Sequence, residues 1–190
     1  MVQLDEERWL LAAREGDLDA FNCLVERYQA AAYTVALHTL RDPDQAADAT
    51  QDAFISAYRA IGQQRGGSFR GWLMRIVVNA CLDLRRREKR RPASSLEAVV
   101  EQIGEAPWAD AASENPESIA LSRETAEAIQ AALAELPEEQ RLAIVLVDVQ
   151  GFSYEEAAQA LGCAVGTVRS RLARGRLRVR DLLVQQGNLL

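Results

Sequence analysis

Histidine, cysteine and long apolar runs are scarce in this sequence, and each scarcity excludes a class of site. The one histidine, His38, and three isolated cysteines, Cys23, Cys81 and Cys163, provide no zinc-ligand spacing. Single cysteines in apolar helical segments are typical of small core residues. We therefore expect neither a structural metal nor a cofactor.

Membrane and export signals are lacking too. No uninterrupted apolar stretch approaches the roughly 20 residues of a membrane span. The first residues, MVQLDEERW, are acidic, unlike those of a signal peptide. Catalytic motifs are also lacking, because His38 has no triad partner and no nucleophile motif is present. These absences favour a cytoplasmic protein that is not an enzyme, inserts in no membrane and takes no small-molecule substrate.

Charge is segregated along the chain, although the net charge is only −6. Residues 85–91 read RRREKRR, and residues 169–180 hold six arginines and no acid. Between these blocks, residues 92–118 hold six acids and no base. A protein binds phosphate groups through local clusters of basic residues, and the net charge of the whole chain need not be positive. The pattern therefore favours a nucleic-acid partner.

The clearest motif covers residues 151–180. Ser153 and Glu156 have capping-box spacing, which predicts a helix from Tyr154. Gly162 then supplies a sharp turn, and an arginine-covered second helix follows. This pattern predicts a helix-turn-helix whose second helix enters the major groove of DNA. A solvated helical hairpin is the alternative, but an acid-free arginine run in an acidic chain favours DNA.

Helical periodicity dominates the rest of the chain, and no strand or repeat is evident. Further helices are expected over residues 6–15, from 18, over 43–61, from 69 to the stop at Pro92, from 119, and over 138–150. Periodicity fades over residues 92–118, where we expect a linker with a short helix around 96–103. The predicted fold is all-α: two small helical domains, residues 1–91 and 119–190, joined by the acidic flexible linker 92–118.

The helix expected over residues 43–61 has two distinct sides. Its inner side would consist of Ala47, Thr50, Phe54, Ala57 and Ile61. Its outer side would be polar, with Asp44, Asp48, Gln51, Asp52, Ser56 and Arg59. A solvated helix side and a protein-binding surface both fit this pattern.

Taken together, these segments resemble the bacterial extracytoplasmic-function (ECF) sigma factors of RNA polymerase, in the sigma-70 family. The matching stretches are DLDAFNCLVERYQ (17–29), DATQDAFISAYRAI (48–61), FRGWLMRIVVNACLDLRRR (69–87), LPEEQRLAIVLVDVQGFSYEEAAQALG (136–162) and VGTVRSRLARGR (165–176). Their order and spacing cover nearly the whole chain outside the linker. The resemblance implies sigma domain 2 in residues 1–91 and sigma domain 4 in residues 119–190.

A sigma factor would bind core RNA polymerase at its β′ clamp helices and β flap, direct it to −35/−10 promoters and assist promoter opening. The resemblance assigns the β′ contact to Asp48, Gln51, Asp52 and Ile55. It assigns single-stranded −10 DNA to loop 62–68 and the helix after it, with the candidates Asn79, Arg75, Arg86, Arg87 and Phe69. Phe69 also fits a helix core, the more frequent role of an aromatic residue at helical spacing.

The duplex −35 element would be read by domain 4. The candidate residues are Gly166, Thr167, Arg169, Ser170 and Arg174, and arginine can bind guanine with two hydrogen bonds. Arg176, Arg178 and Arg180 lie further along and fit backbone contacts or solvent. Ala164 and Ala173 depart from residues common in the family, so the −35 sequence is left open.

The resemblance further implies an anti-sigma factor, often at the membrane, that holds the protein in check within a stress or envelope response. The acidic linker would then enter the RNA-exit path of polymerase or act as a solvated tether. Two other functions fit parts of the sequence. One is a helix-turn-helix regulator with a ligand or dimerisation module, and the other is a helical interaction protein without a DNA role.

Overall fold

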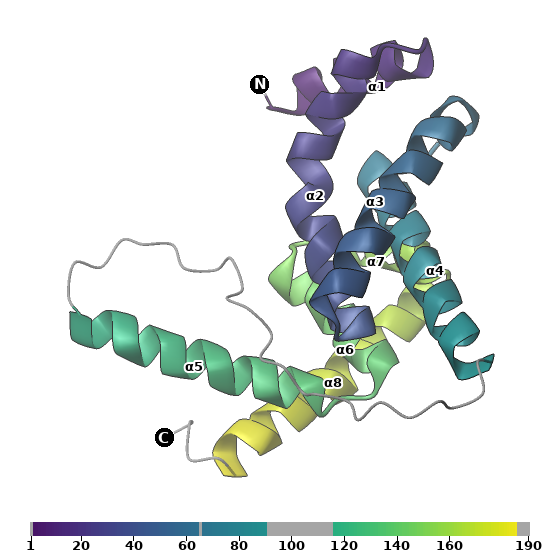
Figure 1. Cartoon of the computed structure of the whole chain (residues 1–190). Coiled ribbons are helices and arrows are strands. Elements are labelled where there is room, and N and C mark those ends of the chain that lie inside the picture. Colours follow the sequence, from purple (N-terminus) through teal and green to yellow (C-terminus); the bar gives the residue numbers. More distant parts are fainter. Residues whose placement is uncertain (1, 65, 91–115, 186–190) are drawn as a thin grey trace.

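The computed structural model describes residues 2–64, 66–90 and 116–185, and the regular elements within these ranges are all helical. They form two groups (Figure 1). The first comprises α1 (Val2–Arg14), α2 (Leu18–Leu40), α3 (Pro43–Ala60), the short 3-10 helix η1 (Ile61–Gln63) and α4 (Phe69–Arg90). The second comprises α5 (Pro116–Ala134), α6 (Glu138–Ile144), the π-helix η2 (Val145–Val149), α7 (Tyr154–Leu161) and α8 (Val165–Gln185).

The predicted all-α fold is confirmed. None of the described helices is both long enough and apolar enough to cross a membrane. The second group begins at Pro116, so the last residues of the predicted linker belong to α5. The short helix expected around residues 96–103 lies outside the described residues.

Helix α2 is the centre of the first group and packs against α1, α3 and α4. Leu24 and Val35 on α2 and Leu73 and Val77 on α4 are fully buried. Burying one such side chain contributes roughly 1.5–3 kcal/mol relative to leaving it exposed. These residues belong to one hydrophobic core that continues into the second group, where it includes Leu146.

The start of α3 follows the sequence prediction, and so does its buried side except at Ala47. Asp42 caps the helix by accepting a hydrogen bond from the backbone N–H of Gln45 (2.9 Å), with Pro43 in the first turn. Ala47, predicted to face inward, is exposed. The other four predicted residues are buried, and so are three alanines that were not predicted: Thr50, Phe54, Ala57 and Ile61, with Ala46, Ala49 and Ala53. Alanines let α3 approach its neighbours closely, which turns Ala47 to the edge of the packed face.

The helix-turn-helix in the second group is confirmed. Ser153 accepts a hydrogen bond from the N–H of Glu156 (3.1 Å), and the Glu156 carboxylate accepts one from the N–H of Ser153 (3.0 Å). Gly162 ends α7 with a φ of 61°, a conformation that glycine adopts without steric cost. Val168 and Leu172 of α8 are buried against the other helices of the group.

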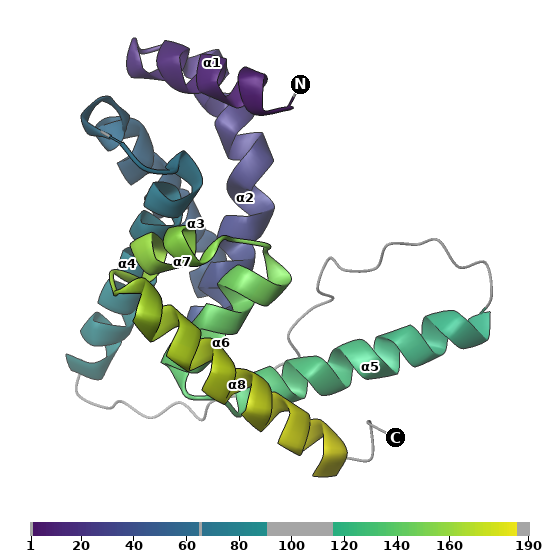
Figure 2. The ribbon, with the colours of Figure 1, turned by 180° about the vertical axis from the view of Figure 1, so that it is seen from behind.

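The two groups pack against each other. Helix α7 lies along α4, and α6 contacts α2. Seen from behind, α5 projects away from the body of the molecule and meets α8 near one end (Figure 2). The two helical domains are thus held in one defined arrangement.

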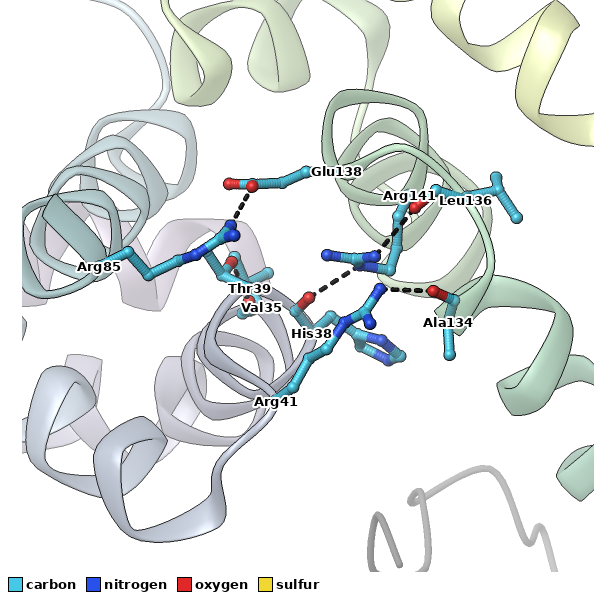
Figure 3. Close-up of polar contacts among 9 residues, drawn as sticks. All are labelled: Val35, His38, Thr39, Arg41, Arg85, Ala134, Leu136, Glu138 and Arg141. Atoms are coloured by element: carbon cyan, nitrogen blue, oxygen red, sulfur yellow. Dashed lines mark hydrogen bonds and ion pairs between the residues drawn. The ribbon is translucent and has the colours of Figure 1, made fainter. Parts of the chain in front are cut away.

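Where the two domains meet, an arginine from each domain donates a hydrogen bond to a backbone oxygen of the other domain (Figure 3). Arg141 of α6 is only 3% exposed; its Nε donates to the backbone oxygen of His38 (2.8 Å) and its Nη1 to that of Leu136 (3.1 Å). Arg41, which follows α2, donates to the backbone oxygen of Ala134 at the end of α5. A positive charge at a helix C-terminus is favourable, since the carbonyls there carry partial negative charge.

The same cluster suppresses protonation of His38. Burial, followed by the charges of Arg141 and Arg41, lowers the pKa of His38 to about 4. Burial is also the main reason that the pKa of Arg141 is lowered, to about 10. His38 is thus neutral at physiological pH, and it is a packed core residue with no catalytic partner in the described part of the chain.

We predict that the free energy of unfolding decreases as the pH falls below about 6.5, the pKa of histidine in an unfolded chain. The unfolded chain then binds a proton that the folded chain does not accept until about pH 4. Between pH 7 and pH 5 the loss should be about 2 kcal/mol, measured by urea denaturation. The His38→Gln variant should show a much smaller loss, and an equal loss in both proteins would contradict the assignment.

Candidate nucleic-acid and polymerase interfaces

The predicted −35 residues lie in the first turns of α8. Gly166, Arg169 and Arg174 are exposed, whereas Thr167 and Ser170 are half-buried. The Ser170 hydroxyl donates to the backbone oxygen of Thr167 (2.9 Å), and Arg174 Nη2 donates to that hydroxyl (3.3 Å). The structure therefore brings all five together on one helix end.

The arginines of α8 differ in their partners. Arg171 forms an ion pair with Glu139 of α6 (2.7 Å), and Arg176 binds Asp148 of η2 through two hydrogen bonds (2.9 and 2.5 Å). The hydrogen bonds to Asp148 are the main reason that the pKa of Arg176 is raised. Such pairs join α8 to the preceding helices of its domain.

Arg169 and Arg174 form no ion pair with any described residue. The Arg169 guanidinium lies 5.8 Å from the centroid of the Tyr154 ring, and Arg174 folds back along its own helix to Ser170. These exposed contacts are weak and easily exchanged. Both guanidinium groups are thus available to an external acceptor.

The basic candidates of the first domain share a surface on α4. Arg75, Asn79 and Arg86 are exposed and lie at a spacing that places them on one side of the helix. They span about 16 Å along its axis. Arg87 is also exposed, about a third of a turn away from that side. An amide flanked by guanidinium groups can bind a base edge and adjacent phosphates at once.

Phe69 was predicted to contact −10 DNA, but the structure places it in the protein core. Its side chain is 4% exposed and packs with the rings of Tyr28 (centroids 5.8 Å apart) and Trp72 (5.7 Å). A ring packed into the helical core has no face available for a base. Phe69 is therefore a core residue, because the first turn of α4 turns its apolar side toward α2.

Loop 62–68 before α4 is shaped by Gln64, which sequence reasoning missed. Gln64 is 5% exposed, and its amide donates to the backbone oxygen of Gly66 (3.0 Å). Arg14 of α1 donates to the backbone oxygen of Gln64 (3.1 Å) and to its side-chain oxygen. Gly66 and Gly67 both have positive φ, 69° and 72°, so the loop needs two residues without Cβ.

Two of the predicted polymerase-binding residues, Gln51 and Ile55, line an apolar groove that was not predicted from the sequence. Asp48, Gln51, Asp52 and Ile55 are all exposed on α3. The groove, about 1000 Å³, runs between α2 and α3, and its lining includes Leu18, Phe21, Val25, Tyr33, Gln51, Phe54, Ile55 and Tyr58. The signal in the sequence was the apolar residues Leu18, Val25 and Tyr33, which widen the apolar side of α2 beyond its buried stripe.

This groove suits a protein partner. Leu18 is 55% exposed, Ile55 42% and Tyr58 37%, which is unusual for large apolar side chains beside one another. The carboxylates of Asp48 and Asp52 lie on the same helix. An apolar centre with a charged rim is the usual composition of a protein–protein interface.

Comparisons with known proteins agree with this division into two domains. The family model described as Sigma-70 region 2 matches residues 24–91, and the model described as Sigma-70, region 4 matches residues 126–179. The chain is 45% identical over 176 residues to the ECF RNA polymerase sigma factor SigM of Mycobacterium tuberculosis (92% of this chain, 83% of the relative). It is 39% identical to the ECF RNA polymerase sigma-E factor of Escherichia coli, with 92% of each chain covered.

Two solved structures have a similar fold. CnrH in complex with the cytosolic domain of CnrY gives a TM-score of 0.68 at 27% identity, over 95% of this chain and 98% of that chain. The sigma factor RpoE of Bartonella quintana, in complex with the anti-sigma factor NepR, gives 0.69 at 28% identity, over 87% of this chain and 98% of that chain.

Proposed function

The chain belongs to the ECF sigma factors of the sigma-70 family, and from this we propose that it binds core RNA polymerase and directs it to −35/−10 promoters. It is thus a transcription initiation factor and not an enzyme. The main support is the occurrence of regions 2 and 4 in one chain, in order. A helix-turn-helix regulator is not favoured, because region 2 would have no role in it.

We assign sigma domain 2 to residues 1–91, the acidic linker to 92–118 and sigma domain 4 to 119–190. The apolar groove between α2 and α3, which Gln51 and Ile55 line, is the proposed surface for the β′ clamp helices, together with Asp48 and Asp52, which are exposed on the same helix α3. Its exposed apolar side chains would supply affinity, and the carboxylates would select a partner with basic residues.

Helix α8 is the proposed reader of the −35 element. Gly166 is the second residue of the helix, where a backbone N–H can approach a phosphate closely, and Thr167 and Ser170 offer hydroxyl groups nearby. Arg169 and Arg174 lack ion-pair partners among the described residues and are the proposed base contacts. Arg171 and Arg176 are not proposed as base contacts, because each already forms an ion pair that connects α8 to α6 or η2.

Helix α4 is the proposed reader of the −10 element as a single strand. Asn79 offers a donor and an acceptor to the edge of a flipped base, and Arg75, Arg86 and Arg87 offer charge to the phosphates beside it. Trapping an unpaired base makes promoter opening more favourable, because the closed duplex gains no such contact.

We further propose regulation by an anti-sigma factor in the cytoplasm or at the membrane. The two similar structures, CnrH and RpoE, were both solved with a protein bound, and NepR is named as an anti-sigma factor. The groove between α2 and α3 is exposed in the free chain and suits such a partner as well as polymerase.

The proposed function is tested by transcription from purified components. Core polymerase plus this chain should produce transcripts with defined start sites from host genomic fragments, and core polymerase alone should not. A chain that binds duplex DNA by itself but leaves core polymerase inactive would be a regulator, which would contradict the proposal.

Replacing Arg174 by alanine should reduce discrimination at one −35 base pair by about 1–3 kcal/mol. The measurement is selection from a promoter library randomised across the −35 element. Arg176→Ala is the matched control, because Arg176 is held by Asp148 and should not change the preferred sequence. A uniform loss across all sequences would instead make Arg174 a phosphate contact.

Replacing Asn79 by alanine should impair promoter opening more than duplex binding, because the amide is proposed to bind only an unpaired base. Opening is measured by permanganate reactivity of unpaired thymines, and binding by retardation of the holoenzyme–promoter complex. Glu7→Ala, at an exposed position on α1, should leave opening nearly unchanged. Equal losses of opening and binding in Asn79→Ala would refute the pocket role.

A further inference from the structure

The loop between η1 and α4 is held by α1, a helix to which the proposed function gives no role. Gln64 follows η1 and is only 5% exposed. Arg14, in the last turn of α1, donates to the backbone oxygen of Gln64 (3.1 Å) and to its side-chain oxygen. One guanidinium group thus anchors the start of the loop at two points.

The Gln64 amide extends this anchor into the loop. Its Nε2 donates to the backbone oxygen of Gly66 (3.0 Å), and its backbone N–H donates to the backbone oxygen of Ile61 (3.2 Å). A buried amide costs free energy when a donor or an acceptor is unpaired. Without Arg14, both oxygens of Gln64 would lose this donor. The loop conformation that satisfies Gln64 therefore depends on α1.

The hydrogen bond to Gly66 also fixes the direction of the next peptide group. In a trans peptide the C=O and N–H bonds point in opposite directions. Because the Gly66 oxygen points toward the side chain of Gln64, the N–H of Gly67 points away from that side chain. Gly66 and Gly67 are exposed, and without a Cβ their backbone can approach a ligand closely. The loop therefore presents a backbone donor in a fixed direction.

Helix α1 is itself fixed on α2 by a second set of contacts. The Tyr28 hydroxyl donates to Glu6 (2.7 Å), and Arg27 forms an ion pair with the same carboxylate (3.1 Å). Burial is the main reason that the pKa of Tyr28 is raised to about 12, so the hydroxyl keeps its proton at physiological pH. The Tyr28 ring also packs on Phe69, the first residue of α4. Helix α1 is thereby connected to the residues on both sides of the two glycines.

We propose that Arg14 and Gln64 are positioning residues for the −10 element: they hold the Gly66–Gly67 peptide so that the N–H of Gly67 donates to an acceptor on an unpaired −10 base. Helix α1 then helps to decide which base is preferred, without contacting the DNA itself. The proposal rests on the proposed function, in which α4, directly after this loop, binds the −10 strand. An unpaired base is read through its Watson–Crick edge, and a donor held in one direction discriminates between edges better than a mobile one.

The proposal is tested by selection with holoenzyme from a promoter library randomised across the −10 element. Arg14→Ala should reduce the base preference at one −10 position about fivefold, which corresponds to about 1 kcal/mol, the typical contribution of one hydrogen bond. Arg8→Ala is the matched control, because Arg8 is exposed on the same helix and its loss changes the net charge equally. The control should keep the wild-type preference. A loss spread evenly over all positions would make the Gly67 N–H a phosphate contact and overturn the proposal.

Two further variants separate positioning from charge. Arg14→Lys keeps the charge but lacks the planar fork that binds two oxygens, so its preference should lie between those of wild type and Arg14→Ala. Gln64→Glu keeps an acceptor for Arg14 but places a carboxylate where the donor to Gly66 was, and it should weaken the preference at the same position. Unchanged preferences in both Arg14→Ala and Gln64→Glu would refute the positioning role.

Combining the two substitutions tests whether the residues act together. If both act through the Gly66–Gly67 peptide, the double variant Arg14→Ala/Gln64→Glu should lose no more preference than the worse single variant. Fully additive losses would mean two independent effects and would contradict the proposal. Thermal unfolding followed by circular dichroism should give nearly the same Tm for Arg14→Ala and wild type, because the Arg14 side chain is exposed.

Nuclear magnetic resonance of the free chain tests the geometry without DNA. The order parameters of the Gly66 and Gly67 N–H groups should fall in Arg14→Ala, from about 0.8 toward 0.6, and stay unchanged in Arg8→Ala. If wild-type holoenzyme gives no transcripts, the proposed function falls, and the order parameters still decide whether Arg14 holds the loop. If transcripts appear but neither the order parameters nor the base preference changes in Arg14→Ala, only the positioning role is refuted.

Discussion

The buried guanidinium of Arg141 is the constraint on which the arrangement of the two domains depends. A charged group can be taken out of water only where its donors find acceptors, and these are the backbone oxygens of His38 and Leu136. The first lies near the end of α2 and the second follows α5. The position of α6 is therefore fixed relative to α2 and α5. Because η2, α7 and α8 come after α6 in the chain, their positions depend on it.

Arginine has two distinct roles in this protein, although the sequence does not distinguish them. Arg70, Arg141 and Arg176 lie near backbone oxygens or carboxylates and hold helices together. Arg169 and Arg174 are exposed, with weak local contacts. The number of arginines in the sequence therefore exceeds the number of guanidinium groups that are free of contacts within the protein.

The sequence predicted helix ends well where the interactions that form them join residues close together in the chain. The caps at Asp42 and Ser153 and the turn at Gly162 all formed as expected, because capping hydrogen bonds join residues three positions apart. Helical periodicity also predicted most of the buried side of α3 and was wrong only at Ala47, because hydrophobicity does not distinguish Ala46 from Ala47. The π-helical turn of η2 had no signal in the sequence.

The sequence alone determined the all-α class, the helix-turn-helix and the family, since these depend on spacing along the chain and on the kinds of side chain. Tertiary structure decided that Phe69 is a core residue, that Gln64 shapes the loop before α4, and that Gln51 and Ile55 line an apolar groove. It also decided which arginines bind the protein itself. Such properties depend on groups that lie far apart in sequence, such as Arg141 and His38, and only packing brings them within hydrogen-bond distance.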